Sequence, residues 1–149
     1  QHYHLIVLEG LDCSGKTTIC KNLASSLGPC TPLAFPDRSS RVGQIADDYL
    51  KNKDGRQSPV DQHELHLLFS ADRYAKAATI ERALQTSNVV CDRYWYSGTA
   101  YSVAKGLDYE WCRDTDKYLP KPDFVFFLDV DAETVATRPG FGGEAHDST

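Results

Sequence analysis

A short stretch near the start of the chain has the residue types of a phosphate-binding loop. Residues 10–17 read Gly-Leu-Asp-Cys-Ser-Gly-Lys-Thr and fit the pattern G-x-x-x-x-G-K-[ST]. Gly10 and Gly15 permit backbone angles and close approaches that a Cβ would block, so successive N–H groups can converge on a polyphosphate. Lys16 would neutralise β- and γ-phosphate oxygens, and the Thr17 hydroxyl would ligate Mg²⁺. The stretch predicts a nucleotide site rather than a glycine turn beside a surface lysine.

A second candidate is the sequence Asp92-Arg93-Tyr94, which directly follows the apolar run Asn88–Cys91. If that run is a parallel strand, its carboxyl end lies at the sheet edge where ligands bind. The Asp92 carboxylate could hold Mg²⁺ through water, and the forked donors of Arg93 could bridge two phosphates. The alternative is an Asp–Arg pair that only ties the strand to a neighbouring helix.

A helix in the middle of the chain carries residues suited to a nucleobase. Phe69 and Arg73 are four positions apart, so they project from one helix face. A flat ring beside a guanidinium can stack on a base and donate a hydrogen bond to a carbonyl, whereas the alternative makes Phe69 core and Arg73 a solvated charge. His63 and His66 on the same helix are interpreted as solvated histidines, because a third metal ligand is not evident. Arg38 is a further anion-binding candidate. The sequence contains no N-K-x-D base-reading motif, which argues against a GTPase.

The elements that must position these residues follow from the apolar pattern. Continuous apolar runs at Leu5–Leu8, Asn88–Cys91 and Phe124–Leu128 predict buried parallel strands. Thr31–Phe35 is a weaker candidate for one more strand. Helical patterns between them predict a layered α/β domain with right-handed crossovers. The helix that carries Phe69 is expected to begin with Ser58 as N-cap and Pro59 at its first position, and to run to near Arg82.

Composition limits the class of protein. The chain has 149 residues, 41% hydrophobic and 25% charged, with a formal net charge of -5, which is typical of one globular domain. The acidic net charge argues against a nucleic-acid binder. A membrane-spanning helix is not predicted either, because the sequence contains no run of about 18 apolar residues. The five cysteines are widely spaced and never form C-x-x-C, so they indicate neither a disulfide framework nor a zinc site. We therefore expect the protein in a reducing compartment, which is the cytoplasm or the nucleus.

Several motifs in order give the chain a family resemblance. The segments L-E-G-L-D-x-x-G-K-T-T, F-P-D-R, H-L-L-F-S-A-D-R, D-R-Y-x-Y-S-G-T-A-Y, L-P-K-P-D and G-F-G-G-E resemble thymidylate kinases of the eukaryotic and viral type over essentially the whole chain. The resemblance implies the three-layer P-loop NTPase fold, with a central parallel sheet and helices on both faces. It also implies transfer of the γ-phosphoryl group of Mg-ATP to dTMP, by a homodimer that binds ATP, dTMP and Mg²⁺.

The resemblance also assigns roles to individual residues. It makes Lys16, Arg93 and Asp12 catalytic, and Thr17 and Asp92 the Mg²⁺ residues. The residues implied for ATP are Gly10, Asp12, Cys13, Ser14, Gly15, Lys16, Thr17, Thr18 and Arg138, the last of them packing on adenine. The residues implied for dTMP are Asp12, Phe35, Arg38, Phe69, Arg73, Arg93, Ser97, Gly98 and Tyr101. Within that set Asp12 would contact the sugar hydroxyl, Arg38 the phosphate, Phe69 the face of thymine, Arg73 its O4, and Tyr101 the sugar.

The resemblance further predicts that residues 1–149 form one nucleoside monophosphate kinase domain that is incomplete at its C-terminus, with a lid at about 138–149. Cys13 stands where the eukaryotic-type family has a basic residue, so slower turnover is expected. Two alternatives remain open from the residues: a kinase of this fold for another monophosphate or for a deoxynucleoside, and a nucleotide-binding homologue with weak catalysis.

Overall fold

A four-stranded parallel sheet organises the chain. The computed structural model describes residues 2–11, 14–51, 61–131, 133–134 and 137. The strands are β1 (Leu5–Glu9), β2 (Cys30–Ala34), β3 (Asn88–Asp92) and β4 (Phe124–Phe127), in the spatial order β2-β3-β1-β4 with every pairing parallel. All four predicted strands are confirmed to within one residue at each end.

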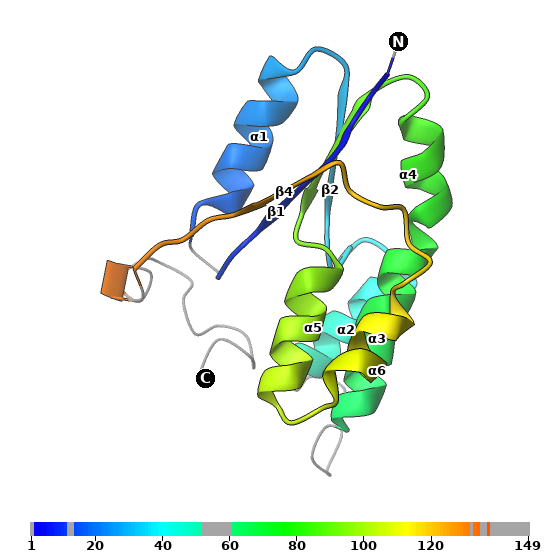
Figure 1. Cartoon of the computed structure of the whole chain (residues 1–149), viewed down its shortest axis with the longest axis vertical. Helices are drawn as coiled ribbons and strands as arrows, with labels where there is room; N and C mark the ends of the chain where they lie inside the picture. Colours follow the sequence, from blue (N-terminus) through cyan, green and yellow to red (C-terminus); the bar gives the residue numbers. More distant parts are fainter. Residues whose placement is uncertain (1, 12–13, 52–60, 132, 135–136, 138–149) are drawn as a thin grey trace.

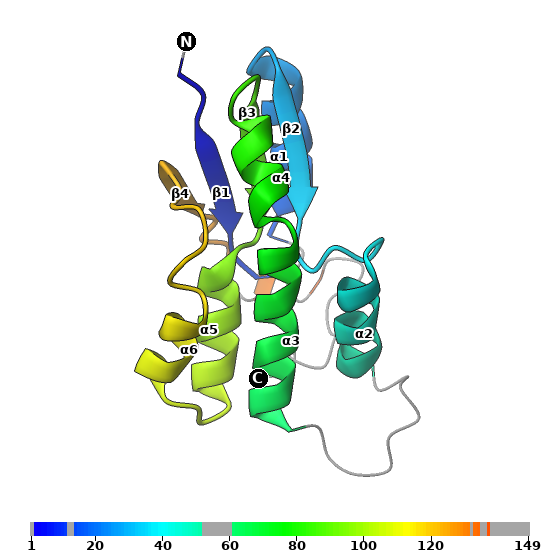
Figure 2. The ribbon, with the colours of Figure 1, turned by 90° about the vertical axis from the view of Figure 1, so that its right-hand side faces the viewer.

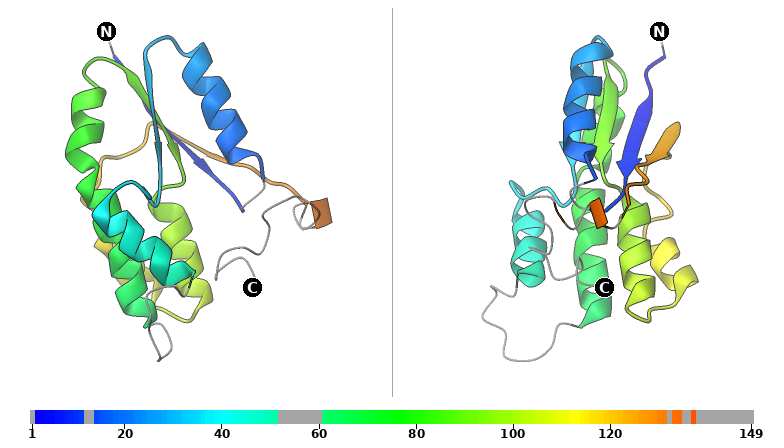
Figure 3. Two further views of the ribbon diagram at one scale, coloured as in Figure 1. Left: turned by 180° about the vertical axis from the view of Figure 1, so that it is seen from behind. Right: turned by 90° about the vertical axis from the view of Figure 1, so that its left-hand side faces the viewer.

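Helices cover both faces of the two central strands, as their apolar runs predict. Side chains alternate between the faces along β1, so Leu5 and Val7 belong to one buried cluster and Ile6 and Leu8 to the other. Helix α1 (Lys16–Ser26) contributes Cys20 to the Ile6 and Leu8 cluster, and α4 (Ala77–Ala83) contributes Ile80 to the opposite one. Figures 1 and 3 show α1 and α4 on opposite sides of the strands. Each central strand is therefore buried on both faces.

The other helices gather beyond the carboxyl ends of the strands. They are α2 (Arg41–Leu50), α3 (Gln62–Ala75), α5 (Trp95–Ala104) and α6 (Tyr109–Thr115). In Figure 2 the strand arrowheads point toward this group, in which α3 lies between α2 and α5, and α6 packs beside α5. The loops that follow β1, β2 and β3 therefore face the helices from which the candidate base-binding residues project.

The helix predicted to run from Ser58 to near Arg82 differs from the one observed. Its N-cap is Asp61, whose carboxylate accepts hydrogen bonds from the backbone N–H groups of His63 and Glu64. Ser58 and Pro59 lie outside the described residues. The helix also ends at Ala75, and α4 begins at Ala77 after a tight turn in which the N–H of Lys76 donates to Arg73 O.

The prediction that the fourth strand is buried was wrong. In the described part of the chain β4 pairs only with β1, at the edge of the sheet. Its four side chains are 43–67% exposed, because no described helix covers them. Among the described residues no helix combines the length and the apolar character that a membrane crossing needs.

Candidate functional site

The phosphate loop joins the buried strand β1 to helix α1. Gly10 and Gly15 have φ angles of +147° and +99°, which L side chains rarely adopt, and a Cβ on Gly10 would lie 3.0 Å from the carbonyl oxygen of Leu128. Gly15 is the N-cap of α1 and supplies no capping side chain. The first N–H groups of α1 are therefore not capped by Gly15, and with the helix dipole they form an anion site.

The side chain of Lys16 folds back onto this loop. Lys16 is 5% exposed, and its Nζ donates to the carbonyl oxygen of Leu11 at 2.5 Å and to Ser14 Oγ at 3.4 Å. The ammonium group is thus held at the mouth of the loop, where a bound polyphosphate would accept the same hydrogen bonds. Asp12 and Cys13 lie outside the described residues, as do Arg138 and the predicted lid, so their roles stay predictions.

Two predicted metal residues come together although they are 75 positions apart. Thr17 Oγ1, in the first turn of α1, donates to Asp92 Oδ2 at the end of β3 over 2.8 Å. The strands bring this about, because Leu8 of β1 is paired in register with Asp92. A hydroxyl and a carboxylate are oxygen donors of the kind that Mg²⁺ prefers, so these two residues fit a magnesium ion bound to phosphates. Thr18 is exposed on the same turn.

Arg93 is the only described non-glycine residue with a positive φ, +68°. Such a backbone costs about 1–3 kcal/mol and persists where surrounding contacts enforce it. Here the Arg93 N–H donates to Leu8 O at 2.8 Å, and Nη1 donates to Ser97 Oγ and Tyr101 Oη at 3.2 and 3.0 Å. The strained turn therefore directs the guanidinium along α5 instead of back toward the sheet.

Sequence reasoning missed Glu9, the last residue of β1. Glu9 is 4% exposed; its Oε1 accepts the N–H of Tyr94 at 2.6 Å, and its Oε2 accepts the hydroxyl of Ser97. Burial raises the pKa of this carboxyl, while the hydrogen bonds and the charge of Arg93 act in the opposite direction. The signal for it was a charged residue ending an otherwise apolar strand. Glu9 fixes the turn that carries Arg93.

A cavity opens between α2, α3 and α5, at the carboxyl end of the sheet. It gathers seven of the nine residues that the resemblance assigns to dTMP: Phe35, Phe69, Arg73, Arg93, Ser97, Gly98 and Tyr101. They come from the loop after β2, from one face of α3, from the loop after β3, which carries Arg93, and from one face of α5. Phe69 is half-buried and lines the cavity, so it is not a core residue, and its stacking on a base stays a prediction.

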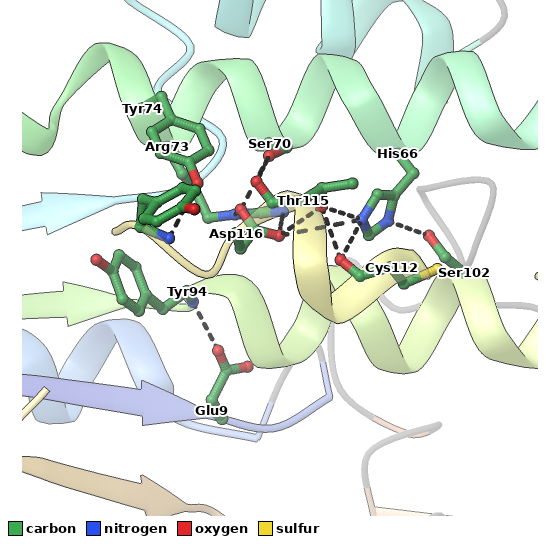
Figure 4. Close-up of polar contacts among 11 residues, drawn as sticks. Glu9, His66, Ser70, Arg73, Tyr74, Tyr94, Ser102, Cys112, Thr115 and Asp116 are labelled. Carbon is green, nitrogen blue, oxygen red and sulfur yellow. Dashed lines mark hydrogen bonds and ion pairs between the residues drawn. The ribbon is translucent and has the colours of Figure 1, made fainter. Parts of the chain in front are cut away.

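Arg73 is buried, not a solvated helix charge. It is 3% exposed and forms a two-pronged ion pair with Asp116, with Nε–Oδ1 and Nη2–Oδ2 distances of 2.9 Å each (Figure 4). His66, expected to be solvated, is 1% exposed and hydrogen-bonded on both ring nitrogens, so that prediction was wrong. His63 is exposed as expected. Sequence reasoning missed Asp116 because nothing near it in the chain distinguishes it from a surface acid.

The loop after β2 is fastened to α3 by a second missed carboxylate. Asp72 Oδ2 accepts the N–H of Asp37 at 2.8 Å and its Oδ1 accepts the hydroxyl of Ser40 at 3.1 Å, while burial raises the Asp72 pKa. Arg38 does not line the cavity and instead donates from Nε to Asp47 Oδ1 at 2.7 Å. The predicted contact of Arg38 with a phosphate stays a prediction.

Acid should weaken this loop in a defined pH range. A hydrogen bond from Lys76, 2.8 Å away, and others from Ser39 lower the pKa of Asp37 to about 2, below its usual 3.8. A lowered folded-state pKa stabilises the fold above pH 3.8, and that contribution is lost as the pH falls through about 2. Asp37→Asn should therefore reduce the free energy of unfolding by about 1–2 kcal/mol at pH 6 and by about half as much at pH 3. Urea unfolding at both pH values checks this; a pH-independent difference would contradict it.

The chain is similar to known proteins in sequence. The family model described as thymidylate kinase matches residues 8–149. A thymidylate kinase of Caenorhabditis elegans is 48% identical over 154 residues, which cover 94% of this chain and 69% of the worm protein. One of Arabidopsis thaliana is 49% identical over 148 residues, covering 96% of this chain and 55% of the plant protein.

A solved structure shows the same similarity in three dimensions. The thymidylate kinase of Candida albicans superposes with a TM-score of 0.87 at 36% identity, covering 98% of this chain and 71% of that chain. The P-loop NTPase fold expected from the sequence is confirmed. The chain is similar along nearly its whole length to these relatives, while it spans 55% of the plant protein and 69% of the worm protein.

Proposed function

This chain belongs to the thymidylate kinase family, and from that premise we propose that it transfers the γ-phosphoryl group of Mg-ATP to dTMP, giving dTDP and ADP. The observation that carries the proposal is the cavity beside the phosphate loop. It combines a ring on α3, a buried guanidinium on the same helix face, and a second guanidinium aimed along α5. ATP is the phosphate donor that the family implies.

The donor is bound by the phosphate loop. The N–H groups at the start of α1 and the ammonium of Lys16 would contact the β- and γ-phosphates, replacing the hydrogen bonds that Lys16 now makes to Leu11 and Ser14. Thr17 and Asp92 would hold Mg²⁺ between them and the phosphates. When bound, that ion neutralises developing charge on the transferring group.

The acceptor occupies the cavity. Phe69 would stack on the thymine ring, Arg73 would donate to its O4, and Tyr101 would lie against the deoxyribose. Arg93 donates its N–H to Leu8 O of β1, the strand that leads into the phosphate loop, and it also lines the cavity, so its guanidinium would contact the phosphates of both nucleotides. Phosphoryl transfer needs little covalent assistance from the protein, because holding donor and acceptor in line and countering negative charge provide most of the rate.

One coupled assay tests the proposal. The enzyme is supplied with ATP and Mg²⁺, and ADP release is followed with dTMP, dUMP, UMP or thymidine as acceptor. We expect dTMP to give the highest kcat/KM. A preference for UMP or thymidine would favour a different kinase of the same fold, and binding of ATP and dTMP without formation of dTDP would favour a nucleotide-binding homologue.

Removing the Asp92 charge should weaken the metal requirement selectively. Asp92→Asn is expected to raise the Mg²⁺ concentration for half-maximal activity by about 10-fold or more, because an amide attracts the cation less than a carboxylate does. The measurement is a titration of free Mg²⁺ at constant ATP. Asp114→Asn, an exposed carboxylate on α6, serves as the control. An unchanged Mg²⁺ dependence in Asp92→Asn would remove Asp92 from the metal site.

The family also bears on the oligomeric state and the cellular location of the protein. We propose a homodimer acting in the cytoplasm on small nucleotides, in one nucleoside monophosphate kinase domain whose lid includes residues 138–149. Sedimentation equilibrium of the full-length enzyme tests the dimer directly. A monomer at micromolar concentration would contradict it.

A further inference from the structure

A buried acid at the end of α6 supports the base-binding arginine from behind. Asp116 is 2% exposed and caps the C-terminus of α6. Its two oxygens accept the Nε and Nη2 hydrogens of Arg73, 43 positions earlier in the chain, at 2.9 Å each. This two-pronged geometry fixes the plane of the guanidinium as well as its position. A single hydrogen bond would leave the group free to swing.

Further polar groups hold the acid itself in place (Figure 4). Ser70 Oγ donates to Asp116 Oδ1 at 3.0 Å, and Thr115 Oγ1 lies 3.2 Å from Oδ2. His66 continues the network: its Nε2 lies 3.1 Å from Cys112 O and 2.9 Å from Thr115 Oγ1.

The protonation of His66 follows from its partners. Burial lowers the His66 pKa, so the ring is neutral, and because a carbonyl oxygen only accepts, Nε2 carries the hydrogen. Nδ1 then accepts from Ser102 Oγ at 2.7 Å. The network therefore ties α3, α5 and α6 together around one buried ion pair.

The opposite side of the guanidinium faces α5 and the cavity. A Cβ built on Gly98 would lie 2.8 Å from Arg73 Nη2 and 3.0 Å from Nη1, so a side chain there would displace the guanidinium from Asp116. Within the described residues Nη1 makes no hydrogen bond, and Arg73 lines the cavity. The Nη1 donors that Asp116 leaves unused lie beside Gly98 of α5, which also lines the cavity.

From these contacts we infer that Asp116 is a positioning residue: it fixes the Arg73 guanidinium in the orientation that selects a 4-oxo pyrimidine over a 4-amino pyrimidine. The inference rests on the proposed function, in which Arg73 contacts O4 of thymine. A guanidinium only donates, so it is matched by a carbonyl at C4 and is opposed by an amino group there. Because Asp116 holds the Arg73 guanidinium on the side away from the base, the guanidinium cannot turn away from a 4-amino group. The two groups of donors therefore stay opposed, and the 4-amino pyrimidine binds more weakly.

The test is a kinetic comparison of two changes on α6, both made in the full-length enzyme. Asp116→Asn keeps the shape of the side chain and removes its charge. Displacing a binding group by about 1 Å can cost up to 10²-fold, so we expect the KM for dTMP to rise about 10- to 100-fold. The KM for ATP should stay within about twofold, and the kcat/KM preference for dTMP over dCMP should shrink about 10-fold.

Asp108→Ala is the matched control at the other end of the same helix. Asp108 is the exposed N-cap of α6 and accepts the N–H of Trp111, so its loss weakens α6 without touching Arg73. We expect a lower melting temperature with both KM values and the base preference unchanged. If Asp116→Asn behaved like this control, Asp116 would have only a structural role and the inference would be overturned.

Two further variants keep the outcomes distinct. Ser70→Ala removes only the hydroxyl donor to Asp116. It should raise the KM for dTMP by less than Asp116→Asn does, and it can be measured even if Asp116→Asn does not fold. An unchanged KM for dTMP in Ser70→Ala would count against the inference.

Arg73→Lys tests the proposed contact of Arg73 with O4 of thymine. If it leaves the KM for dTMP unchanged, the proposed contact with O4 fails. If it raises that KM while Asp116→Asn does not, only the inference about Asp116 fails.

Discussion

Replacing Lys16 by Met should lower kcat for phosphoryl transfer by about 10²–10³-fold, with the protein still folded. The Met side chain has nearly the same length and fits a site that is 5% exposed, but it brings no positive charge to the phosphate loop. The transition state spreads negative charge over the transferring group, and Lys16 is the described cation held against this loop. Single-turnover measurement of ADP formation at saturating ATP and dTMP gives the effect on chemistry separately from binding.

Lys21 provides the control for this prediction. It lies on the exposed side of the same helix, away from the loop, so Lys21→Met changes the net charge equally. Its kcat should stay within about twofold of the parent, because an exposed charge beyond the first turn is largely screened. A Lys16→Met enzyme that retained comparable activity would show that other groups bind the γ-phosphate.

Arg73→Leu should have the largest effect on stability among the residues of the cavity. It would leave the Asp116 carboxylate buried at 2% exposure without its cation, which costs about 3–5 kcal/mol in the free energy of unfolding. Urea unfolding at neutral pH and constant protein concentration measures this loss. The double variant Arg73→Leu, Asp116→Asn should recover part of it, because the uncompensated charge is then gone.

The pair formed by Arg38 and Asp47 gives the exposed counterpart. Its distance of 2.7 Å is shorter than those between Arg73 and Asp116, yet the Arg38 side chain is 50% exposed. Arg38→Leu should therefore change the free energy of unfolding by no more than about 1 kcal/mol. Equal losses for the two arginine variants would mean that burial does not control the strength of these ion pairs.

Local features of the sequence were sufficient for the sheet and the phosphate loop. The run Leu5–Glu9 is apolar on both faces up to its last residue, and glycines at positions 10 and 15 meet a backbone requirement that few other residues satisfy. The face shared by Phe69 and Arg73 followed from the helical period alone. In each case the physical cause acts over a few neighbouring residues, so it can be read without knowing the rest of the fold.

Burial in the second half of the chain was harder to predict. The run Phe124–Phe127 forms the expected strand, but its position at the edge of the described sheet leaves it exposed. His66 has the opposite outcome, since its position on α3 is covered by α5 and α6. Periodicity predicts which side chains share a face, but the packing of other elements decides whether that face is covered.

The sequence by itself was enough to predict the groups proposed to contact phosphates and a base: Lys16, Thr17, Arg93, Phe69 and Arg73. Only the tertiary structure decided which acids position them. Glu9 accepts the N–H of Tyr94 across 85 positions and so holds the turn that carries Arg93, and Asp116 accepts from Arg73 across 43. The chain carries 21 acidic residues, and they look alike until strand register and helix packing bring particular ones into contact with a buried cation. An ion pair is defined by distance in space and by exclusion of water, and neither is encoded in the local pattern around a single aspartate.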